Sequence, residues 1–168
     1  MSNCRKQQHC TGVAIVSIGN ELRQDDGIGI AVLDRLCEEI TSPFCRFDLD
    51  CYSNHLIDCV KGHNLAIIVD STLNQGNPGN VTLIDLNSAI KHRQTLRLNS
   101  CHALSLIDEL QLAQWQSQLP ERLYFFGVEA SNTDWTEGLT PILKEQLPLI
   151  TQQLKEALDI LSLSNSHA

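Results

Sequence analysis

Uninterrupted runs of apolar, β-branched residues constrain the fold of this chain more than any other feature. Residues 13–18 and 65–69 form two such runs, and only Ser17 breaks the first. A half-exposed strand would alternate polar and apolar residues, so these runs are typical of strands covered on both faces, as in a parallel sheet between helices. The longest fully apolar run, 65–69, has five residues, whereas a membrane span needs about 20. We therefore expect no membrane association.

The rest of the pattern predicts three more strands and several helices. The additional strands are expected at residues 47–52, 81–86 and 123–128. The helices are expected at 27–40, about 55–60 with Asn54 as its N-cap, 99–113, and 142–161. Pro148 inside the last of these predicts a kink or two separate helices, because proline cannot donate the helical hydrogen bond.

Strands that alternate with helices predict an α/β fold with three layers, helix–sheet–helix. We expect a twisted, mostly parallel five-stranded sheet. The Pro-Gly loop before Val81 favours an antiparallel pairing for that one strand. A chain of 168 residues is long enough for one domain with a proper core. We place that domain at 12–163, between a short polar tail, 1–11, and a second short tail, 164–168.

Charge and cysteine content narrow the possible partners and compartment. Twelve Lys and Arg stand against 20 Asp and Glu, which gives a net charge of −8. Such a chain repels a phosphate backbone, so we expect no nucleic-acid partner. The seven cysteines form no C-x-x-C pair, and a chain of this length does not need a disulfide framework. We therefore expect mostly buried thiols in a reducing cytoplasm.

Acidic residues and one histidine follow the predicted strands at their carboxyl ends, where open α/β sheets usually bind ligands. The order along the chain is Asp26 after the first strand, Asp50 after the second, Asp70 at the end of the central strand, and His102 before the next long helix. The carboxylates of Asp26 and Asp70 with the imidazole of His102 would suit a borderline divalent metal such as Ni²⁺, Zn²⁺, Co²⁺ or Mn²⁺. Asp25 is interpreted as the N-cap of the helix that follows.

Two other kinds of site need to be weighed on the residues alone. Cys51 is expected at the same sheet edge and could reach His102, so Cys–His catalysis stays open. Cys101 adjoins His102 in sequence, but adjacent residues on a helix do not face each other. Gly19 and Asn20 are not part of a G-x-G-x-x-G motif, and acids stand where a pyrophosphate would bind. We therefore exclude a nucleotide site.

The segment from Ser17 to Gly29, SIGNELRQDDGIG, closely resembles the opening signature of the hydrogenase maturation endopeptidases. These proteases process the large subunit of nickel–iron hydrogenases. The family pattern is a strand, then G-x-G-N-x-L-x-x-D-[DE]-G-x-G, then a helix, and Ser17 stands here in place of the first glycine. Three further segments follow in the family's order: AIIVD ending at Asp70, SCHALSL around His102, and FGVE followed by GLTP within residues 126–141. The likeness spans about residues 12–163.

The resemblance implies a metal-dependent, aspartic-type endopeptidase. It would remove a C-terminal extension from the nickel-loaded precursor of a [NiFe] hydrogenase large subunit. The family's metal contacts carry over to Asp26, Asp70 and His102, and its acid after the second strand carries over to Asp50 as a further catalytic candidate. Asp26 stands where many members have glutamate, and Cys51-Tyr52-Ser53 replaces a Gly-Gly-Thr-like loop. The nickel ion would arrive with the substrate, so the enzyme alone need hold no metal.

The expected partner is thus a hydrogenase large-subunit precursor, processed in the cytoplasm by a monomer. Two alternative functions stay open, and each predicts a different experimental outcome. A non-catalytic, metal-sensing chaperone would hold the large subunit and release it uncut. A Cys-dependent hydrolase would use Cys51 or Cys101 and would be inactivated by thiol alkylation.

Overall fold

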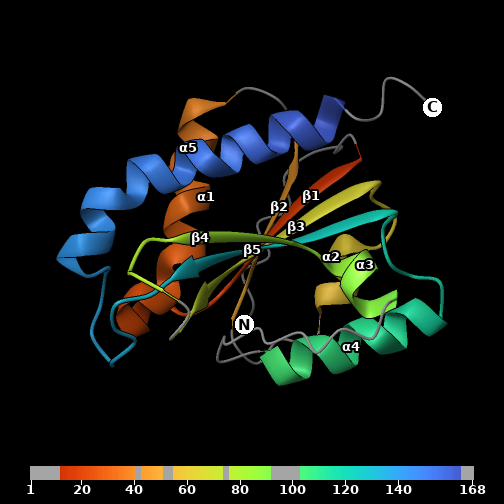
Figure 1. Ribbon diagram of the computed structural model, residues 1–168, viewed down its shortest axis with the longest axis horizontal. Helices are drawn as coiled ribbons and strands as arrows, with labels where there is room; N and C mark the ends of the chain where they lie inside the picture. Colours follow the sequence, from red (N-terminus) through yellow and green to blue (C-terminus); the bar gives the residue numbers. More distant parts are fainter. Residues whose placement is uncertain (1–11, 41–42, 51–54, 74–75, 92–102, 164–168) are drawn as a thin grey trace.

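The computed structural model describes residues 12–40, 43–50, 55–73, 76–91 and 103–163, and within these ranges five strands form one sheet (Figure 1). The strands are β1 (Val13–Ile18), β2 (Cys45–Leu49), β3 (Leu65–Thr72), β4 (Val81–Asp85) and β5 (Arg122–Glu129). They lie in the order β2-β1-β3-β5-β4. All neighbouring pairs are parallel except β4 with β5, which is antiparallel. The predicted sheet, with its single antiparallel strand, is confirmed.

The helices cover both faces of this sheet. They are a 3-10 segment η1 (Glu21–Gly27), α1 (Ile28–Glu39), α2 (Leu56–Val60), α3 (Leu86–Lys91), α4 (Ala103–Trp115) and α5 (Pro141–Leu163). Figure 1 shows α1 and α5 on one side of the sheet and α2, α3 and α4 on the other. The three-layer architecture therefore agrees with the prediction.

Two apolar clusters hold the layers together, and each uses alternate residues of the same buried strands. On β3, Ile67 and Val69 pack in the cluster with α1 and α5, whereas Ala66 and Ile68 pack in the cluster with α2, α3 and α4. All four side chains are fully buried. Successive side chains of a strand point to opposite faces. A strand that feeds both clusters must therefore be apolar throughout, which is the pattern seen in the sequence.

Three elements differ from the prediction. β2 begins at Cys45 rather than at residue 47, because Arg46 is accommodated on the edge strand by ion pairs to Asp34 (2.7 Å) and Asp48 (3.0 Å). The short helix α3 was not predicted, since its six residues are too few for a clear helical period. The helix predicted at 55–60 is α2, whose N-cap is His55 and not the predicted Asn54. The start of the helix predicted at 99–113 lies outside the described residues.

The last helix contains Pro148 but is continuous from Pro141 to Leu163. The alternative of two separate helices is therefore wrong. Pro148 is exposed, so the carbonyl that loses its helical partner can be solvated, and the helix tolerates the residue. Neither α5 nor any other helix in the described ranges combines the length and apolarity that a membrane crossing requires.

The cysteines only partly follow the expectation of buried thiols. Cys59 is a thiol buried in the cluster that α2 covers, as expected, while the thiol of Cys37 is exposed. Cys45 takes part in a disulfide, and neither Cys37 nor Cys59 is its partner. Cys45 is therefore not one of the buried thiols that the composition suggested.

Candidate active site

Four buried carboxylates gather at the carboxyl ends of the parallel strands. Asp25 and Asp26 belong to η1, which follows β1, while Asp70 lies near the end of β3 and Glu129 ends β5. The first three are fully buried and Glu129 is 3% exposed. Burying charged groups is costly unless hydrogen bonds or counter-charges compensate them, so each of these carboxylates requires specific partners.

Ser71 donates hydrogen bonds to both Asp26 and Asp70. The Ser71 hydroxyl donates to Asp26 Oδ1 (3.1 Å), and the Ser71 backbone N–H donates to Asp70 Oδ1 (2.7 Å). The second oxygen of Asp26, Oδ2, accepts the backbone N–H of Asn20 (3.0 Å). The sequence placed both acids at this edge. Their shared serine bridge, across 45 residues of chain between Asp26 and Ser71, is visible only in the structure.

The other predicted site residues are distributed differently. Asp50 lies just beyond β2 at the same edge, but its side chain is exposed, so it is not part of the buried group. His102, Cys51 and Cys101 lie outside the described residues. The helix α4 begins one residue after His102 and packs on the sheet face that carries Ala66 and Ile68. By strand alternation this is also the face of Asp70.

Glycines of the opening motif let η1 and α1 approach the strands that carry the site. Gly19 has φ +145°, and a Cβ atom there would lie 1.9 Å from the carbonyl oxygen of Asp26. At Gly29 a Cβ atom would lie 2.9 Å from the carbonyl oxygen of Val69. The serine that replaces the family's first glycine, Ser17, is buried and donates to Asp48 Oδ1 on β2 (2.7 Å). The buried serine hydroxyl therefore has a hydrogen-bond partner, and this bond links β1 to β2.

The collision at Gly19 gives a direct test. We expect Gly19→Ala to lower the free energy of unfolding by about 2–4 kcal/mol, because the added methyl meets the backbone of Asp26 and the positive φ is strained. Gly62→Ala is the matched control, since Gly62 also has a positive φ (+80°) but nothing within 4 Å of its Cβ position. Urea unfolding of both variants measures the difference. Equal losses would show that contact with Asp26 is not what requires glycine at position 19.

Asp25 does not cap α1, so that prediction is wrong. The N-cap of α1 is Gly27, which makes no side-chain cap hydrogen bond. The Asp25 carboxylate instead accepts four hydrogen bonds from the loop between β5 and α5. The donors are Ser131 N–H (2.9 Å), Asn132 N–H (3.1 Å), Thr140 N–H (2.7 Å) and the Thr140 hydroxyl (2.9 Å). Asp25 therefore ties η1 to a loop more than 100 residues away.

Two further groups at this edge were not picked out as site residues from the sequence. Ser71 is in no sequence motif that marks a catalytic serine, yet it donates to both aspartates. The Thr72 hydroxyl donates to Glu129 Oε2 (2.9 Å), and these two residues are register partners on β3 and β5. The available signal was their position: each follows a predicted apolar strand at its carboxyl end, the same criterion that selected Asp70.

The chemistry of this group suits a cation. Each carboxylate oxygen can accept more than one hydrogen bond or metal contact, and each Asp26 oxygen has one described donor. None of the ion pairs among the described residues involves Asp26. A divalent cation would compensate this buried charge. The described residues do not by themselves form a set of three metal-binding side chains, and His102, the third ligand of the prediction, lies outside them.

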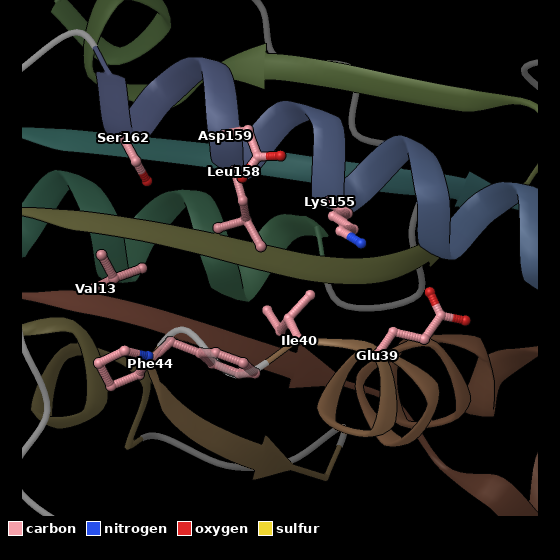
Figure 2. Close-up of a pocket in the computed structure, with 9 residues that line it drawn as sticks. Val13, Glu39, Ile40, Phe44, Lys155, Leu158, Asp159 and Ser162 are labelled. Carbon is pink, nitrogen blue, oxygen red and sulfur yellow. The ribbon is translucent and has the colours of Figure 1, made fainter.

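Two of the surface hollows among the described residues differ in their distance from the carboxylates. A hollow of about 340 Å³ between the start of β1, the end of α1 and α5 is lined by Val13, Ile40, Phe44 and Leu158 (Figure 2). Val13 begins β1, so this hollow lies at the opposite edge of the sheet from the acids. A second hollow of about 540 Å³ includes Thr72 and Glu129 in its lining. It therefore borders the carboxyl edge beside Ser71.

Comparison with known proteins agrees with this arrangement. The family model described as hydrogenase maturation protease matches residues 45–157, more than half of the chain. Hydrogenase 2 maturation protease of Escherichia coli K12 is 23% identical over 148 residues, which cover 87% of this chain and 90% of that protein.

Solved structures of such proteases share the fold. The hydrogenase maturating endopeptidase HybD from E. coli superposes with a TM-score of 0.74 at 21% identity, over 89% of this chain and 93% of that one. The [NiFe] hydrogenase maturation protease HybD from Thermococcus kodakarensis gives 0.68 at 22% identity, over 88% and 99%. The matched family model, together with the mixed sheet and its acidic edge, shows that the chain belongs to the hydrogenase maturation protease family.

Proposed function

We propose that this protein is the endopeptidase that removes a C-terminal extension from the nickel-loaded precursor of a [NiFe] hydrogenase large subunit. It would act in the cytoplasm as a monomer. One observation carries the proposal: in a chain of this family, the buried carboxylates of Asp26 and Asp70 both lie at the ligand-binding edge of the sheet, where each accepts a hydrogen bond from Ser71. A hollow of about 540 Å³ at Thr72 and Glu129 borders the same edge of the sheet.

In this proposal Asp26, Asp70 and His102 contact the nickel that the precursor brings. Two carboxylates and an imidazole are ligands suited to that ion. The metal would anchor the precursor so that the scissile bond lies near the enzyme's carboxylates, and this positioning lowers the entropic part of the barrier. Nickel is thus part of the substrate, and recognition of it would delay cleavage until the metal has been inserted.

The protein's own contribution is a fixed arrangement of acids. The Asn20 N–H and the Ser71 hydroxyl hold both oxygens of Asp26, so little reorganisation is needed when the substrate binds. Hydrolysis also requires a base that takes a proton from the attacking water. Asp50 is the proposed candidate, because it is exposed at the same edge and can meet water directly.

Mass spectrometry of the precursor tests this function. Purified precursor of the hydrogenase large subunit from the same organism is incubated with the protein, before and after nickel insertion. We expect loss of a C-terminal peptide from the nickel-loaded form alone. A stable complex with uncut precursor would instead indicate a chaperone. Inactivation by thiol alkylation, with equal cleavage of both precursor forms, would indicate a Cys51- or Cys101-dependent hydrolase.

A further inference from the structure

Two exposed apolar side chains stand close to the candidate site on loops from opposite ends of the chain. Leu22 of η1 is 57% exposed, and Trp135, in the loop between β5 and α5, is 76% exposed. Arg23 joins the two loops, because its guanidinium carbon lies 5.5 Å from the centre of the Trp135 ring. We call Leu22, Arg23 and Trp135 the docking wall. Tryptophan and arginine are the residues that most often dominate protein–protein binding energies.

The docking wall is fixed rather than adaptable. The Gln24 N–H donates to the Thr136 carbonyl (2.8 Å), and the Asp25 N–H donates to the Asn132 carbonyl (3.1 Å). Behind them, the Asp25 carboxylate accepts its four hydrogen bonds from the same loop. Gln24 itself is held at φ +46°, which is unusual for a residue with a side chain. A surface held in this way loses little conformational entropy when a partner binds.

The docking wall is also continuous with the site. The Asn20 side chain accepts the Leu22 N–H (2.9 Å), while the Asn20 N–H donates to Asp26 (3.0 Å). Figure 1 shows the loop after β5 passing the start of α1, at the sheet end where the acids gather. A protein that brings a bond to Asp26 therefore approaches Leu22 and Trp135 as it binds.

Charge indicates what the partner surface looks like. Three exposed acids, Glu21, Asp134 and Glu137, lie within two residues of the docking wall in sequence. They belong to the same two loops, in a chain of net charge −8. An acidic rim around an apolar centre fits a partner with an apolar side chain flanked by basic residues, because complementary charges steer association and fix orientation.

We propose that the docking wall binds the large-subunit precursor through an apolar polypeptide segment flanked by Lys or Arg, and so positions the precursor at Asp26 and Asp70. This inference rests on the proposed function. The docking wall does not contact the reacting bond, so its role appears in binding and not in the chemical step.

Kinetic constants for processing test the docking wall. We expect Trp135→Ala to raise KM for the nickel-loaded precursor about 30-fold and Leu22→Ala about 5-fold, with kcat within about twofold of wild type, because hot-spot side chains contribute mainly to binding. Trp115→Ala is the matched control, since Trp115 is 82% exposed but ends α4, far along that helix from its start. An unchanged KM for Trp135→Ala would overturn the proposal.

Direct binding separates this inference from the proposed function. Association of immobilised precursor with wild type, Trp135→Ala and the Glu21→Gln/Glu137→Gln pair is measured between 50 and 300 mM salt. We expect about 30-fold weaker binding for Trp135→Ala, and a flatter salt dependence for the pair. If the wild-type protein binds the precursor without cutting it, and Trp135→Ala no longer binds it, the docking wall is supported and the protease function is disproved. If all variants bind the precursor equally well, the binding role of the docking wall is disproved, even when cleavage is normal.

Discussion

Asp26→Ala is expected to reduce processing of the nickel-loaded precursor by about a thousandfold or more. The substitution removes the carboxylate that Asn20 and Ser71 hold in place, and with it a proposed contact to the substrate metal. Asp70→Ala and His102→Ala should have effects of similar size, because the three side chains would act as one ligand set. Cleavage is measured as the rate of release of the C-terminal peptide.

Variants of graded chemistry sharpen this test. Asp26→Asn keeps the size and can still accept hydrogen bonds, but it loses the charge, so it should be nearly as inactive as the alanine variant. Asp26→Glu should retain substantial activity, because many members of this family carry glutamate at this position. The control is Asp159→Ala, which removes an exposed carboxylate at the opposite edge of the sheet. Normal cleavage by Asp26→Ala and His102→Ala, both folded, would disprove the site assignment.

Asp25→Ala is expected to cause the largest loss of stability among the acidic positions. It leaves four donors of the loop between β5 and α5 without their acceptor, in a place where the carboxylate is fully buried. Unsatisfied buried donors cost about 1–3 kcal/mol each, and partial solvation of the loop reduces the sum to about 3–5 kcal/mol. This corresponds to a melting temperature about 6–20 °C lower.

The acceptor chemistry of Asp25 can be separated from its size. Asp25→Asn places an N–H₂ group against at least one backbone or hydroxyl donor, so this isosteric change should still cost about 2 kcal/mol or more. Asp134→Asn in the same loop is the control, because Asp134 is exposed and its carboxylate accepts from the Asn132 side chain only two residues away. Calorimetric melting of the three proteins provides the measurement. Equal stability of Asp25→Asn and wild type would show that Asp25 does not brace the loop.

Much of the fold follows from local patterns. The strands predicted at 13–18, 65–69 and 123–128 lie within or match β1, β3 and β5, because strands buried on both faces must be apolar throughout. The edge strand β2 was misplaced by two residues, since its polar Arg46 depends on Asp34 of α1. The short helix α3 was missed, because packing of Leu86 and Ile90 against the sheet, rather than helical periodicity, stabilises it.

The candidate site was likewise predictable from the sequence only in part. Asp26 and Asp70 could be found from the sequence, because the carboxyl ends of parallel strands meet at one edge and each acid follows an apolar run. Nothing local marks Ser71 as the group that donates to both. Asp25 and Asp26 are adjacent and chemically identical, yet one is tied to the loop after β5 and the other to Ser71.

The sequence by itself determined the layers of this protein, its family and the edge of the sheet where its acids gather, because burial patterns and short motifs are written in neighbouring residues. Only the tertiary structure decided what each acid does. The partners of Asp25 lie 106 to 115 residues away, and such contacts depend on how strands and loops are brought together in space. The same folding sets Trp135 beside Arg23, and so creates a surface that neither segment has alone.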